Sequence, residues 1–225
     1  MTNNNTSRLA ATAGIAIGPI LFVVAILAVL VGAIAAGSGG FTGSATTESV
    51  RVRASVLIQQ ANNIKTATDR VIVNGTGPTA IIVAESPATP TSSSAIYTTA
   101  GGGITPQNPP AGSVPTGSTW RFVLDADLPG IGAADGDFIA VIQVTEQTCE
   151  ALNNIIFGTG VLSSIPSLGT TPDVTIAAAA AGDNVTPAGN AFDQGGSPDT
   201  EYDGRINACV ADGTDYYFYQ LLSAG

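Results

Sequence analysis

The sequence predicts an α+β fold, in which a long N-terminal helix, first hydrophobic and then amphipathic, packs on a small antiparallel β-sheet. Residues 15–36 are almost entirely apolar, and residues 48–73 repeat apolar side chains at helical spacing. Short β-branched and aromatic runs then alternate with loops rich in Gly, Pro, Ser and Thr. We expect a hydrophobic anchor helix (1–36), a Gly-rich joint (37–47) and a surface domain (48–225) with a loop-rich C-terminal region.

The first segment is long enough to cross a membrane. No charged residue lies between Arg8 and Glu48, and the apolar run from Ile15 to Ala36 has 22 residues. A helix of that length rises about 33 Å, which spans the hydrocarbon core of a bilayer. We therefore expect a retained transmembrane anchor. A secretory signal that is cleaved near Ala36 and a buried core helix are the alternatives.

The next two segments differ in their helical character. Residues 37–44 read GSGGFTGS, a composition that predicts a flexible joint or a melted stretch of helix. From Glu48 to Val73, apolar residues recur every three, four or seven positions, which predicts a helix with one buried face. This face packs on the chain's own sheet or on neighbouring copies. Its members are Val50, Ala54, Leu57, Ala61, Ile64 and Val71.

The remaining chain contains short β-type runs, one short helical run and long loops. Exposed irregular loops are expected at 86–118 and 182–205, because Pro, Gly, Ser, Thr, Asn and Asp dominate there. A short helix is expected at 149–157, and residues 174–181 are ambiguous. The β-branched and aromatic content predicts strands at 79–84, 120–124, 138–144 and 216–222.

Charge and composition argue against several functions. The chain has 7 basic and 17 acidic residues, a net charge of −10, so we expect no nucleic-acid binding. It has no histidine, and it lacks a Gly-x-Ser-x-Gly elbow, a Walker loop and a dinucleotide fingerprint. We therefore expect that it is not an enzyme. The acidic group in the predicted hairpin link is expected to serve in turns; it comprises Asp125, Asp127, Asp135 and Asp137.

The two cysteines, Cys149 and Cys209, are too few for a structural zinc site of the usual kind. An even count beside an export signal indicates a disulfide. Two buried free thiols are the alternative. A bridge that closes the loop of about 60 residues between them contributes roughly 4 kcal/mol of stability in the chain-entropy model.

One local motif is similar to the start of an EF-hand calcium loop. Oxygen-bearing side chains fall at positions one, three, five and nine, and Gly204 stands at position six. The closing glutamate at position twelve is replaced by Val210. A solvated acidic loop is the alternative to a calcium site. The candidate calcium ligands are Asp199, Glu201, Asp203 and Asn207.

The order of these features resembles type IV pilins and pseudopilins: a hydrophobic helix, an amphipathic helix, a small antiparallel sheet and a late cysteine pair. The usual glycine cleavage site with its Phe-Thr-Leu-Ile-Glu-like run is absent, since Pro19 stands five residues after Gly14. The resemblance implies that Cys149 and Cys209 staple a variable surface region. It also implies that the hydrophobic helix lies in the membrane before assembly and in the filament core afterwards.

We therefore expect a structural subunit of a pilus-like filament at the cell surface. Its partners would be other copies of itself, the inner membrane before assembly and the pilus assembly machinery. The alternative is a monomeric adhesion module, membrane-anchored or secreted. The side chains expected to form the helical core of the filament are Ile20, Val24, Leu27, Val31, Leu57, Ala61 and Ile64.

Overall fold

The chain forms two compact units, Met1–Thr47 and Glu48–Gly225, and the second unit contains all of the assigned strands. Within residues 17–45 the backbone is described, together with the side chains of Leu27 and Ala28. The computed structural model describes residues 17–85, 91–132, 136–170, 173–175 and 191–225.

Helix α1 (Ile17–Val73) has 57 residues and contributes to both units. It continues through residues 37–47, so the predicted non-helical joint is not present there. Glycine costs about 1 kcal/mol relative to alanine in a helix, whereas each residue added to an existing helix gains its own hydrogen bond. The helical turns on both sides therefore continue across the glycines. Among the described helices, none combines the length and hydropathy that crossing a membrane requires.

The second half of α1 buries the predicted apolar stripe. Ala54, Leu57, Ala61 and Val71 are fully buried, and Val50 at the start of the stripe is half-buried. The helix ends before a glycine cap: Gly75 adopts φ +95°, and its amide donates to the carbonyl of Ile72. The opposite face is polar and exposed. The period of the apolar residues thus correctly predicted which face turns inward.

The segment after α1 differs from its prediction. A strand was expected at 79–84, but the chain forms a short 3-10 helix, Pro78–Ala80, and a single bridge from Ile82 to Ala95. Proline suits the first turn of a helix because it has no amide hydrogen to leave unpaired. The following loop is irregular as predicted but not wholly exposed. Gly102 is buried, and a Cβ added there would lie 2.8 Å from the Cβ of Ala67.

A four-stranded antiparallel sheet forms the centre of the second unit, with the order β1-β2-β6-β5. Its strands are β1 (Arg121–Ala126), β2 (Asp137–Val144), β5 (Asn207–Asp212) and β6 (Asp215–Ser223). The strand predictions at 120–124, 138–144 and 216–222 are confirmed. Strand β5 was not predicted.

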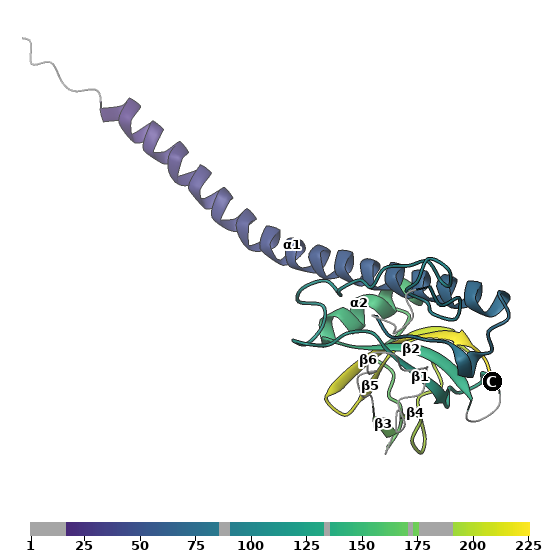
Figure 1. The fold of residues 1–225 in the computed structure, drawn as a ribbon. Helices are drawn as coiled ribbons and strands as arrows, with labels where there is room; N and C mark the ends of the chain where they lie inside the picture. Colours follow the sequence, from purple (N-terminus) through teal and green to yellow (C-terminus); the bar gives the residue numbers. More distant parts are fainter. Residues whose placement is uncertain (1–16, 86–90, 133–135, 171–172, 176–190) are drawn as a thin grey trace, which may run out of the picture. The chain divides into compact units, whose positions relative to one another are not determined.

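Further elements cover the two sides of the sheet (Figure 1). Helix α2 (Glu146–Ile156) confirms the predicted short helix and begins three residues earlier. The ambiguous segment after residue 173 contributes β3 (Asp173–Thr175), and residues 176–181 lie outside the described part of the chain. β3 pairs with β4 (Ala191–Asp193), a strand that was not predicted.

Because side chains alternate along a strand, the sheet has two buried sides. On the helix side, Phe138, Ile142 and Phe218 pack with α2 and the second half of α1. On the loop side, Val141 and Tyr219 pack with β4 and the loops around it. The structure thus confirms an α+β fold in which helices pack on a small antiparallel sheet.

Candidate functional site

The predicted disulfide is present and joins α2 to β5. Cys149 and Cys209 are both fully buried on the helix side, and their Cα atoms are 5.3 Å apart. The two residues are 60 positions apart in the chain. The bridge therefore fixes the edge strand of the sheet to the short helix.

Asn153 reinforces this junction one helical turn after Cys149. Its Nδ2 donates to the carbonyl oxygen of Cys209 at 2.8 Å, and its Oδ1 accepts from the amide of Cys209 at 2.9 Å. The Asn153 side chain is 4% exposed. Edge strands otherwise leave such backbone groups unpaired. The asparagine amide therefore replaces a neighbouring strand at this position.

The same edge of β5 is closed again two residues later. The Ala211 amide donates to the carbonyl of Pro166 at 2.8 Å, and the Leu168 amide donates to the carbonyl of Ala211 at 3.0 Å. With Asn153 at Cys209, these bonds occupy successive outward-facing backbone positions of β5. The edge is thereby protected from pairing with another strand.

The predicted assembly residues fall into two groups. Leu57 and Ala61 are fully buried and Ile64 is 4% exposed, all within their own domain. These three side chains hold α1 on the sheet and leave almost no surface for a neighbouring copy. Leu27 lies in the first half of α1 and is 54% exposed. Ile20, Val24 and Val31 also belong to this half of the helix, and their side chains lie outside the description.

The EF-hand-like segment leads directly into strand β5. Asn207 begins β5, and its Nδ2 donates to Gln220 Oε1 at 3.2 Å. Asp199 Oδ2 accepts the amide of Ser167 at 2.7 Å. Glu201 and Asp203 are exposed, and within the described residues no three acidic, His or Cys side chains are grouped to hold a metal ion.

The physical reason is the pairing of β5 with β6. Val210, at position twelve of the motif, pairs with Tyr217 and is fully buried on the loop side. A strand extends the second half of the motif, whereas a calcium loop must curl so that its oxygens converge. Gly204, with φ +67°, supplies an ordinary turn before the strand.

The acidic group of the β1–β2 link is dispersed. Asp125 is exposed, Asp127 Oδ2 accepts from Gln194 Nε2 at 3.1 Å, and Asp135 lies outside the described residues. Asp137 is fully buried, and its Oδ1 accepts the amide of Gly225 at 3.1 Å. Burial raises the pKa of Asp137, and the nearby Asp127 raises it further.

A second buried polar group on the loop side is the hydroxyl of Tyr202. The residue is fully buried, and its hydroxyl has no hydrogen-bond partner among the described residues. Burial raises the pKa of Tyr202, and the carboxylates of Asp203, Asp199 and Asp127 raise it further. The hydroxyl therefore stays protonated throughout the physiological pH range.

A cleft of about 300 Å³ lies between α1 and the loop that follows it. Trp120 Nε1 donates to Gln60 Oε1 at 3.0 Å, and Gln60 Nε2 donates to the carbonyl of Asn108 at 2.9 Å. Both ends of the Gln60 amide therefore hold the loop and the sheet on the helix. Burial raises the pKa of Tyr97 in the same cleft, and Glu85 raises it further. The polar groups of Gln60 and Trp120 thus serve the fold.

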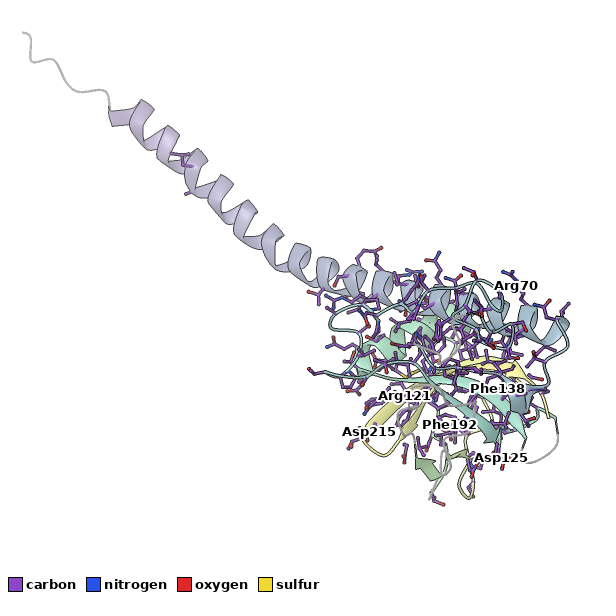
Figure 2. The ribbon with its side chains drawn as sticks, in the orientation of Figure 1. Arg70, Arg121, Asp125, Phe138, Phe192 and Asp215 are labelled. Carbon is purple, nitrogen blue, oxygen red and sulfur yellow. A yellow bond between two sulfur atoms is a disulfide. The ribbon has the colours of Figure 1, made fainter. Side chains whose placement is uncertain are left out.

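A larger pocket of about 410 Å³ opens beside β1, β2 and β6. Arg121 and Gln143 line it together with Tyr217 and the hydroxyl-rich loop 115–119. The guanidinium of Arg121, a residue labelled in Figure 2, makes no hydrogen bond or ion pair with any described residue. The pocket therefore combines a guanidinium that has no partner in the described chain with several neutral polar groups.

Comparisons with protein-family models, with curated proteins and with solved structures found no match to this chain.

Two elements of these sites were not predicted from the sequence. Asn153 was an unremarkable position on a short helix, and its partner lies 56 residues away. Arg121 was treated as a strand residue without a role. The scarcity of basic residues in this acidic part of the chain is the one signal that pointed to it, since residues 74–225 contain two basic and fifteen acidic residues.

Proposed function

We propose that this chain is the structural subunit of an extracellular pilus-like filament, assembled through its N-terminal hydrophobic helix. The observation that carries the proposal is the difference between the two halves of α1. Residues 48–73 use their apolar stripe inside their own domain. The first half has an uncharged sequence from residue 9 to 47, and its Leu27 is 54% exposed. The Leu27 side chain is therefore available to other copies.

The sequence of residues 15–36 supports a membrane location before assembly. It is an apolar run of 22 residues without a charged side chain. In the filament, apolar helices of neighbouring copies would bury this surface against one another, driven by the hydrophobic effect and by dispersion. A helix contact repeated by a rotation that does not close yields an open filament.

The distribution of charge supports an outward-facing surface domain. Residues 48–73 carry four basic and two acidic residues, whereas residues 74–225 carry two basic and fifteen acidic residues. An acidic surface keeps a filament soluble and limits lateral association of filaments. The disulfide suits such a domain because it holds α2 and β5 together. The closed edge of β5 suits it because other strands cannot pair there.

The test is the substitution Leu27→Asp. A carboxylate in the buried helical core would lack a partner, so fibres should be absent or reduced at least about tenfold. Val52→Asp is the matched control, since Val52 lies on the second half of α1 and is 55% exposed. Negative-stain microscopy of the cell surface measures the fibres, and immunoblotting confirms equal amounts of protein.

Normal fibres from Leu27→Asp would argue strongly against the proposal. So would a mature N-terminus near Ala36, measured by mass spectrometry, because the assembly helix would then be lost. That second result would favour an adhesion module that acts as a monomer. The polar pocket beside β1 is the observation that favours this second candidate function.

A further inference from the structure

We propose that the pocket around Arg121 binds an acidic sugar through the sugar's carboxylate. This role goes beyond filament assembly, and it does not depend on it. The pocket is formed by three neighbouring strands, because Arg121 pairs with Val141 and Gln143 pairs with Tyr217. Loop 115–119 and Val174 of β3 also line it. Its volume of about 410 Å³ lies within the range of small-molecule sites, which is roughly 300–1,000 Å³.

Arg121 supplies the group that recognises the carboxylate. A guanidinium presents planar, paired donors that match the two oxygens of a carboxylate. Two other guanidiniums of the domain have partners: Arg205 lies 4.9 Å from the centre of the Phe157 ring, and Arg70 donates to the carbonyl of Thr99 at 3.4 Å. Arg121 has none among the described residues and is half-buried in the pocket wall.

The rest of the lining suits a sugar ring. Thr116, Ser118 and Thr119 provide hydroxyls, which both donate to and accept from the hydroxyls of a sugar. Gln143 Nε2 donates to Asp215 Oδ1 at 3.0 Å, so the carboxylate of Asp215 orients the amide of Gln143. Figure 2 labels Asp215 as well as Arg121. A single cation among neutral polar groups favours a ligand with one negative charge.

The overall charge narrows the ligand further. The chain carries −10, and its field repels polyanions such as nucleic acids before they reach the surface. A small ligand with one carboxylate suffers much less repulsion and gains the full contact with Arg121. An acidic monosaccharide at the end of a glycan meets both conditions.

The experiment is a calorimetric titration of the full-length protein in detergent micelles with D-glucuronate. D-glucose lacks the carboxylate and acetate lacks the ring, so these two separate the contributions. We expect glucuronate to bind at least about tenfold more tightly than either. Arg121→Gln should weaken glucuronate binding by about tenfold or more, and Arg121→Lys should weaken it less, because lysine keeps the charge without the planar fork.

The matched control is Arg205→Gln, which removes the same charge from the same domain outside the pocket. It should bind glucuronate as the wild type does, and all variants should keep the wild-type melting temperature. The proposal is overturned if the wild type does not bind glucuronate at 10 mM, roughly the dissociation constant of the weakest specific complexes. Equal binding of acetate and glucuronate, or unchanged binding by Arg121→Gln, overturns it as well. Filament formation by Arg121→Gln should be normal, so this test and the assembly test fail independently.

Discussion

The two sides of the sheet bury aromatic rings equally well but treat polar groups differently. Phe138 on the helix side and Phe192 on the loop side are both fully buried, and both are labelled in Figure 2. On the helix side, the buried amides of Gln60 and Asn153 have partners at both ends. On the loop side, the Tyr202 hydroxyl has no partner in the described part of the chain.

This difference separates stability from function. A buried polar group with full partners fixes one arrangement of the chain, whereas an unpartnered one costs free energy. The helix side contains the disulfide and the Asn153 contacts, with the hydroxyl of Thr68 as its unpartnered exception. The loop side contains the unpartnered oxygens of Asp137 and Tyr202 and adjoins the Arg121 pocket. We therefore expect removal of a partnered polar group, such as the Asn153 amide, and of an unpartnered one, such as the Tyr202 hydroxyl, to have opposite effects on stability.

The largest effect is expected for Asn153→Ala on the helix side. The substitution leaves the amide and the carbonyl of Cys209 buried without partners, at about 1–3 kcal/mol for each group. We expect a loss of about 3 kcal/mol in the free energy of unfolding, measured by urea denaturation of the oxidised protein. Asn154→Ala is the control, because Asn154 is exposed and should change stability by less than about 0.5 kcal/mol. Equal effects of the two substitutions would show that the Asn153 bonds contribute nothing specific.

The second effect has the opposite sign and concerns Tyr202→Phe on the loop side. Phenylalanine keeps the ring and removes a hydroxyl that lacks a partner among the described residues. Relief of its desolvation cost should raise the free energy of unfolding by about 1 kcal/mol. The matched control is Tyr219→Phe, since the Tyr219 hydroxyl donates to the carbonyl of Arg205 at 3.1 Å. That variant should lose about 1 kcal/mol. A loss of stability in Tyr202→Phe would contradict the contrast between the two sides.

Local sequence patterns predicted the elements that keep one buried face along their whole length. The stripe of Leu57, Ala61 and Ile64 repeats at the helical period, so the buried face of α1 could be predicted. Strand β5 could not, because Asn207, Ala208 and Asp212 have low strand propensity. Pairing with β6 and the closed outer edge make this segment a strand. Tertiary contacts therefore override local preference there, and the same contacts extend the second half of the EF-hand-like segment.

The candidate sites were less predictable than the fold. The disulfide was inferred from an even cysteine count, without geometry. The Asn153 contacts join positions 56 residues apart, and no spacing rule relates an asparagine to a strand edge. The Arg121 pocket is lined by residues of β1, β2, β6 and loop 115–119, so it can be located only once the strand order is known. Such sites depend on the pairing register of the strands, and that register is set by contacts throughout the fold.

The smallest effect is expected for Asp137→Asn, and it should depend on pH. Burial, with the charge of Asp127, raises the pKa of Asp137 above its ordinary value of 3.8, although backbone amides of Gly225 and Leu128 oppose the shift. A raised pKa means that the folded state holds the proton more tightly than the unfolded state. The ionised carboxylate therefore costs stability, and this cost grows as the pH rises from 3.8 through the folded pKa.

Asparagine keeps an oxygen for the Gly225 amide and removes the charge. Asp137→Asn should therefore melt about 2 °C above the wild type at pH 7, and the difference should vanish below about pH 4. Thermal melts between pH 3 and 7 measure it, with Asp125→Asn as the exposed control. An advantage that is larger in acid than at neutral pH would mean that the Asp137 carboxylate stabilises the loop side. The contrast between the two sides of the sheet would then fail at Asp137, a fully buried residue of the loop side.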